Sequence, residues 1–65
     1  MSDLTMHKFL THLATGGTPA TLEVFYPRKV IEAKTYKAFR KGYAEYGVAY
    51  RWAWITDKGR EFLYE

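Results

Sequence analysis

Hydrophobic residues recur at helical spacing near the start of the chain. They predict a first helix over residues 2–14, with one buried side formed by Met6, Phe9, Leu10 and Leu13. Ser2 or Asp3 is placed to accept hydrogen bonds from the exposed N–H groups of the first turn. Gly16 and Gly17 can adopt positive φ, so the helix is expected to end there.

The pattern from Thr18 to Ala33 does not predict a single secondary structure. Residues 21–26 (TLEVFY) are rich in β-branched and aromatic side chains and predict a strand, which Pro27 ends. Residues 28–33 then form either the return strand of a hairpin, favoured by Val30 and Ile31, or a short helix with Pro27 at its first position. Periodicity over six residues does not separate these alternatives.

A second helix is predicted over residues 35–46. Thr35 is a good N-cap, and Gly47 is a natural residue to end the helix. The apolar positions cover an arc of about 160° at 100° per residue; they are Tyr36, Ala38, Phe39, Gly42, Tyr43 and Tyr46. The opposite side is basic and carries Lys34, Lys37, Arg40 and Lys41. This segment therefore combines an aromatic face, which is expected to face the core, with a cationic face, which is expected to face outward.

The last third of the chain predicts a strand followed by a short helix. Residues 48–56 (VAYRWAWIT) alternate in character and place Tyr50, Trp52 and Trp54 on one face. Because a lone strand is unstable in water, we expect it to pair with residues 21–26. Thr56 or Asp57 can cap the final helix. The predicted fold class is α+β, in the order helix, strand, short helix or return strand, helix, strand and short C-terminal helix.

Residues 50–63 (YRWAWITDKGREFL) contain the pairs Ile55-Thr56 and Gly59-Arg60, followed by Phe62 and Leu63. This segment resembles the end of small winged helix-turn-helix proteins, in which a wing strand leads into a capped hydrophobic helix. Residues 35–46 resemble the recognition helix of such domains, and residues 13–17 (LATGG) resemble a small bacterial winged-helix-like group. The resemblance implies a single winged-helix-like domain over residues 1–65 that binds DNA. The chain departs from the family in offering only residues 28–33 as the preceding helix and residues 46–48 as the wing.

Length and composition limit the number of domains and the kinds of site that the chain can form. The chain has 65 residues and no Cys, so it has room for one domain and lacks disulfides, thiolate zinc sites and a Cys nucleophile. Its aromatic content of 18% allows a core at this length, and a homodimer would add stability to a small fold. No apolar run is long enough to span a bilayer, so we expect a cytoplasmic protein.

Charge suggests a polyanionic partner. The net charge is +3, and residues 28–41 carry six basic side chains against Glu32 alone. We expect double-stranded DNA to be contacted by Arg28, Lys34, Lys37, Arg40, Lys41, Lys58 and Arg60. Guanine readout falls to Arg40, with Lys37 or Arg28, because the chain has no Asn or Gln to read adenine. The protein would act as a regulator or a recombination accessory factor. The alternative interpretation of these charges is an ordinary solvated helix face.

The aromatic residues allow a rival function. Tyr50, Trp52 and Trp54 are expected in the core, although they would also suit a stacking platform for single strands or a protein-binding hot spot. The rival is a non-enzymatic interaction module, of the kind encoded by mobile elements, that docks on an acidic host protein. Arg51, on the opposite strand face, is expected to be solvated beside Glu23.

Catalysis is not expected. His7 and His12 lie about 140° apart on the first helix and cannot share a metal. No nucleophile with a base and no glycine-rich phosphate loop is present in the sequence, so neither a catalytic residue nor a cofactor is predicted.

Overall fold

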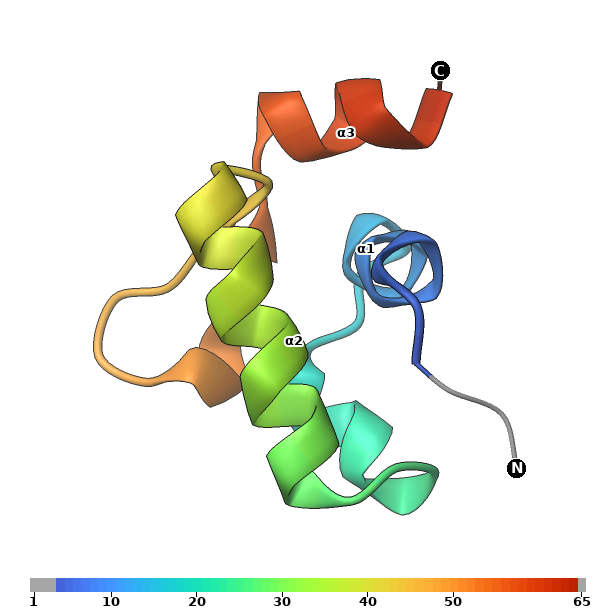
Figure 1. Cartoon of the computed structure of the whole chain (residues 1–65), viewed down its shortest axis with the longest axis vertical. Helices are drawn as coiled ribbons and strands as arrows, with labels where there is room; N and C mark the ends of the chain where they lie inside the picture. Colours follow the sequence, from blue (N-terminus) through green and yellow to red (C-terminus); the bar gives the residue numbers. More distant parts are fainter. Residues whose placement is uncertain (1–3, 65) are drawn as a thin grey trace.

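The computed structural model describes residues 4–64, which form a small compact α+β domain. Within these residues the order of elements is α1 (Met6–Ala14), the 3-10 helix η1 (Pro19–Val24), α2 (Arg28–Lys41), β1 (Ala44–Glu45), the 3-10 helix η2 (Tyr50–Trp52), β2 (Trp54–Ile55) and α3 (Asp57–Tyr64). Figure 1 shows α2 along the length of the molecule, with α1 and the long connection after β1 on opposite sides of it and α3 across its C-terminal end.

Helix α1 confirms the first predicted helix, but it begins later than expected. Thr5 is the N-cap, and its Oγ1 accepts a hydrogen bond from the backbone N–H of Lys8 at 3.1 Å. The predicted caps, Ser2 and Asp3, lie outside the described residues. The helix ends as predicted, because Gly16 has a φ of 94°.

The strand predicted over residues 21–26 is wrong. The chain instead forms η1, which starts with the buried Pro19 and turns Leu22 into the core. The hydroxyl of Thr21 donates to the carbonyl of Thr18 at 2.7 Å and stabilises the turn. Within residues 4–64 the strands β1 and β2 pair with each other, so residues 21–26 have no strand there as a hydrogen-bonding partner and their β propensity is overridden.

Helix α2 decides the alternative left open at residues 28–33 and corrects the boundaries of the second helix. Residues 28–33 are helical and continue without a break to Lys41, with Pro27 as the N-cap. Thr35 is therefore not an N-cap: it lies in mid-helix, fully buried, and its hydroxyl donates to the carbonyl of Ile31 at 2.8 Å. The helix ends before Gly42, whose φ is 82°, and the predicted end at Gly47 is wrong.

The long strand predicted over residues 48–56 is also wrong. Only Trp54–Ile55 is extended in the sheet, and it pairs antiparallel with Ala44–Glu45 in the register Ala44 to Ile55 and Glu45 to Trp54. The pairing with residues 21–26 does not form. The buried side of β2 and the residue before it consists of Ile55 and Ala53, so the inward and outward faces are the reverse of those predicted.

Helix α3 confirms the predicted C-terminal helix. Of the two predicted caps, Thr56 and Asp57, the structure has Thr56. The Oγ1 of Thr56 accepts from the N–H of Gly59 at 3.1 Å and donates to the carbonyl of Gly42 at 2.6 Å, which ties the start of α3 to the end of α2. Phe62 and Leu63 pack against a core formed by Leu4, Phe9, Leu10, Leu13, Leu22, Ile31, Ala38, Ala44 and Ile55.

Candidate nucleic-acid interface

Helix α2 lies on the surface with only a narrow buried stripe. Ile31, Thr35 and Ala38 face the core and span an arc of about 60° at 100° per residue. The stripe consists of medium or small side chains, so the larger side chains of the helix are left outside. A wide exposed surface therefore remains, and its two sides differ in chemistry.

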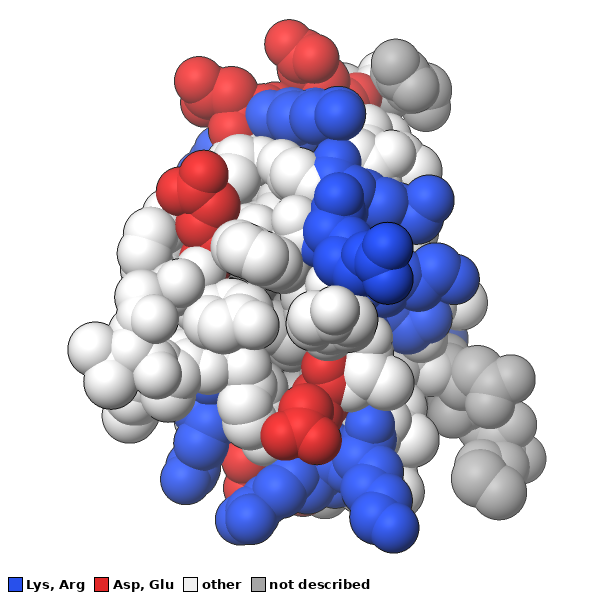
Figure 2. All heavy atoms as spheres, turned by 60° about the vertical axis from the view of Figure 1, so that its left-hand side comes forward, with Lys and Arg blue, Asp and Glu red and all other residues white. Residues whose placement is uncertain are grey.

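One side of this surface is cationic. We call it the cationic flank; it consists of Lys34, Lys37, Arg40 and Lys41, which lie within an arc of about 120°. Lys34 is half-buried and the other three side chains are exposed. Lys37, Arg40 and Lys41 border a shallow hollow of about 360 Å³. Figure 2 shows Lys and Arg side chains gathered along one edge of the face in view, beside a broad area without charges.

Among the described residues, no carboxylate lies within 4 Å of a charged group of the cationic flank. Within residues 4–64, the ion pair closer than 4 Å joins Arg51 and Glu23 instead, with Nε to Oε2 at 3.4 Å and without hydrogen-bond geometry. This pair confirms that Arg51 lies beside Glu23. The charges of the flank are therefore available to a polyanion.

Arg40 stands at the border between the two sides of α2. Its guanidinium carbon lies 5.8 Å from the centre of the Tyr36 ring, one helical turn earlier, which is within the range of a cation–π contact. Among the described residues no carboxylate lies within 4 Å of the Arg40 guanidinium, so its N–H groups can still bind a phosphate or a guanine edge.

The other three predicted DNA contacts, Arg28, Lys58 and Arg60, lie at different places on the molecule. Lys58 extends the cationic flank, since its Nζ lies 3.8 Å from the position that a Cβ on Gly42 would occupy, at the C-terminal end of α2. Arg28 is exposed at the other end of α2, about 20 Å along the axis from Lys41. Arg60 follows Lys58 by two residues on α3 and thus lies about 200° around that helix, away from Lys58.

The other side of α2 is aromatic and was not predicted as a surface. Tyr36 and Phe39 were expected in the core, but their side chains are 55% and 44% exposed. Across from them, the ring of Tyr46 lies 5.1 Å from that of Phe39. The prediction took the helical spacing of these aromatic residues to mark the buried face, whereas the buried residues of α2 are Ile31, Thr35 and Ala38.

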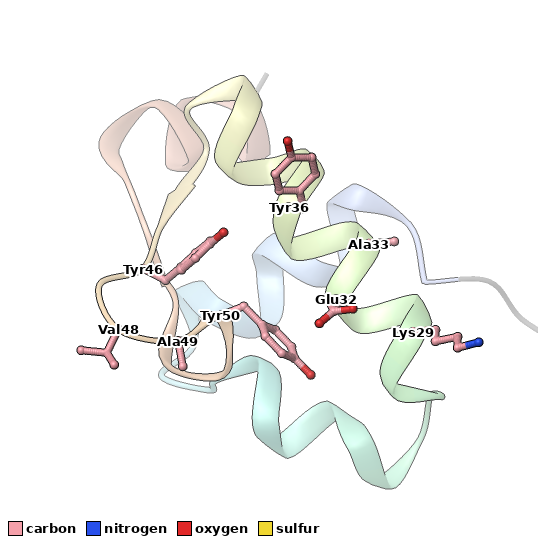
Figure 3. Close-up of a pocket in the computed structure, with 8 residues that line it drawn as sticks. All are labelled: Lys29, Glu32, Ala33, Tyr36, Tyr46, Val48, Ala49 and Tyr50. Carbon is pink, nitrogen blue, oxygen red and sulfur yellow. The ribbon is translucent and has the colours of Figure 1, made fainter.

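A groove runs between this side of α2 and the connection after β1. We call it the aromatic groove; it has a volume of about 640 Å³ and is lined by Lys29, Glu32, Ala33, Tyr36, Tyr46, Val48, Ala49 and Tyr50. Figure 3 shows the ring of Tyr36 on α2 and the rings of Tyr46 and Tyr50 on the connection across from it. No sequence signal marked this groove, because its two walls come from segments that pack only in the folded chain.

The expectation that Tyr50, Trp52 and Trp54 fill the core is wrong for both tryptophans. Trp52 and Trp54 are 62% and 51% exposed, and only Tyr50 packs against the core. The three residues belong to η2 and β2, so they do not line up on one strand face as a stacking platform requires. The exposed indoles remain candidates for protein contacts.

The described residues also bear on whether the protein has a metal site and on the role of the histidines. Over residues 4–64, no group of three or more His, Cys, Asp or Glu side chains is arranged to hold a metal ion. The ring of His12 has a structural role, since its Nε2 lies 3.0 Å from the carbonyl oxygen of Thr18 and 2.6 Å from Oγ1 of Thr21. None of the helices in this part of the chain has the length and apolar character that crossing a membrane requires.

The sequence matches no family model, and neither a curated protein nor a solved structure is significantly similar to it.

Proposed function

We propose that this protein binds duplex DNA through the cationic flank of α2, as a regulator or a recombination accessory factor. The observation that carries the proposal is that Lys37, Arg40 and Lys41 lie exposed on one side of a surface helix, without carboxylate partners among the described residues. Lysine and arginine side chains in such an arrangement neutralise phosphates and release counterions, and this supplies most of non-specific DNA affinity.

The order of elements supports the proposal. A helix-turn-helix needs two helices joined by a turn of three or four residues, with the second helix entering the major groove. Here η1 and α2 are separated by residues 25–27, and α2 is followed by an antiparallel strand pair and a C-terminal helix. We infer that the domain is winged-helix-like, with η1 in the place of the helix that precedes the recognition helix and α2 as the recognition helix.

The connection between β1 and β2 would be the wing, and its composition limits its role. Val48, at the exposed part of this loop, carries no charge, and the charge of Arg51 is paired with that of Glu23. DNA contacts would therefore come from α2 and from Lys58 rather than from the wing. With about four phosphate contacts, log affinity should fall with log salt at a slope of about −3.6.

Fluorescence anisotropy with a labelled duplex, measured over a series of salt concentrations, tests the proposal. Replacing Lys37, Arg40 and Lys41 together by Ala should flatten the slope by about 2.7. For a matched comparison, Lys37→Ala should flatten it by about 0.9 and Lys8→Ala, with the same net charge, should leave it unchanged. Equal effects of the two single variants, or no duplex binding at low salt, would refute the proposal.

The exposed tryptophans favour a second candidate, a non-enzymatic module that docks on an acidic protein. Trp52 and Trp54 are of the residue type most enriched at binding hot spots, and the cationic flank would meet the acidic partner. Under this candidate, Trp52→Ala abolishes binding to the partner and duplex DNA does not bind at physiological salt.

A further inference from the structure

Arg40 is the cation of α2 that lies most directly opposite the core. At 100° per residue, it is about 170° around the helix from the middle of the buried stripe. Lys37 and Lys41 lie about 60° and about 100° from Arg40, both on the same side of it. When a helix enters a major groove, its outermost side chains face the base edges and the side chains beside them face the phosphates. Arg40 is therefore placed for the bases, and the two lysines are placed for the backbone.

Tyr36 restricts the side chain of Arg40 before any DNA is bound. The centre of its ring lies 5.8 Å from the guanidinium carbon, within the range of a cation–π contact. An unrestrained arginine on a protein surface has many side-chain conformations, and it loses them when it binds. The contact with Tyr36 removes part of this freedom in advance, so a smaller entropy cost is left for the binding step.

The base edge that matches Arg40 is that of guanine. A guanidinium presents its N–H groups in a planar fork that fits O6 and N7 of guanine, whereas a lysine ammonium is a point charge. Arg40 is the arginine of the cationic flank, whose other members are lysines. Adenine is read by Asn or Gln, and the chain has neither. The outward side of α2 thus has the chemistry that recognises a G·C base pair.

We propose that Tyr36 positions Arg40 to read guanine in the major groove, so that the protein prefers duplexes with G·C pairs at the contact. This inference rests on the proposed function. It adds a selectivity that the lysines cannot supply, because the phosphates are alike at every base pair. Arg40 touches the base, and Tyr36 acts through Arg40 as a positioning residue.

Fluorescence anisotropy at one low salt concentration, with two duplexes of the same sequence, tests the proposal. One duplex has ordinary G·C pairs; in the other, 7-deazaguanine replaces guanine, so that C–H stands in the place of N7 while the charge and the base pairing are kept. We expect the wild-type protein to bind the ordinary duplex about tenfold more tightly, since one of the two acceptors for Arg40 is lost in the other. Arg40→Lys should remove this preference and leave the salt slope unchanged, because the charge is kept.

Variants of Tyr36 distinguish positioning of Arg40 from packing. Tyr36→Phe keeps the ring and should keep the preference of about tenfold, whereas Tyr36→Leu should lower it to about threefold. The matched control is Phe39→Leu, which removes an exposed ring of the same helix that contacts Tyr46 instead, and it should keep the preference. Circular dichroism of each variant checks that the fold is kept.

Two results would overturn this inference alone. One is equal affinity of the wild-type protein for the two duplexes together with a salt slope of about −3.6, which keeps the proposed function and removes the guanine readout. The other is an equal preference of the Tyr36→Phe and Tyr36→Leu proteins, which removes the positioning role of Tyr36. Absence of duplex binding at low salt would overturn the proposed function and this inference together.

Discussion

A methyl group at position 59 should destabilise the domain, because α3 approaches the rest of the backbone too closely to accept it. A Cβ built on Gly59 lies well inside van der Waals contact with the carbonyl oxygen of Tyr43 and 2.8 Å from Cγ1 of Ile55. That carbonyl oxygen accepts a hydrogen bond from the N–H of Thr56 at 2.9 Å, so it cannot turn away without losing the bond. The side chain of Ile55 is held in the core.

The loss in the free energy of unfolding can be estimated from the displacement of α3 that would relieve this contact. Helix α3 would have to move outward by about 1 Å to restore ordinary contact distances. The movement disturbs the hydrogen bond from Thr56 to Tyr43 and the stacking of Tyr43 on Phe62, whose ring centres are 4.8 Å apart; each is worth about 1 kcal/mol. Overpacking adds about 1 kcal/mol, and the better helix propensity of Ala returns about 1 kcal/mol. We expect Gly59→Ala to lower the free energy of unfolding by about 2 kcal/mol.

Urea unfolding followed by circular dichroism at 222 nm measures this loss. For a domain of this length, the expected loss corresponds to a decrease in Tm of about 10 °C. Gly47→Ala is the matched control, because a Cβ there meets no atom within 4 Å and the φ of Gly47 is not positive. It should leave stability unchanged or raise it by about 0.5 kcal/mol. If the two variants differ by less than about 0.5 kcal/mol, the close docking of α3 is wrong.

Three further predictions concern hydroxyl groups and the ion pair. Thr35→Val should change the free energy of unfolding by less than about 0.5 kcal/mol, while Thr35→Ser should cost about 1 kcal/mol through the lost methyl group; the reverse order in urea unfolding would restore the N-cap role. Thr56→Val should cost about 2 kcal/mol, because the cap of α3 and the bond to Gly42 are both lost, and Thr56→Ser should cost less than half as much; equal losses in thermal unfolding would argue against the cap. Arg51→Ala should cost at most about 0.5 kcal/mol, since the pair with Glu23 is partly exposed; a larger loss that persists in high salt would show that the pair is more than a surface contact.

The aromatic side chains show where prediction from sequence was limited. Trp52 and Trp54 were assigned to the core because of their size, and Tyr36 and Phe39 because of their helical spacing; all four are exposed. The core is instead closed with small residues, among them Ala38, Ala44 and Ala53, because α1, α2 and the sheet approach one another closely. Composition alone carries no information on these distances. The aromatic groove was missed for the same reason.

The sequence by itself determined the features that depend on neighbours a few positions away. The apolar spacing of α1, the glycine that ends it and the placement of Lys37, Arg40 and Lys41 on one side of a helix were all predicted, because helix periodicity and helix ends are local. For the cap of α3 the sequence left Thr56 and Asp57 as alternatives, and the structure has Thr56.

Only the tertiary structure decided the features that need a distant partner. Residues 21–26 and 48–53 have strand-like composition but become 3-10 helix and loop, because a strand exists only where another strand supplies hydrogen bonds. The two-residue strands pair across a connection that also forms one wall of the aromatic groove. Thr35 likewise changed from a predicted helix start to a buried mid-helix residue once packing against the core extended α2 back to Arg28.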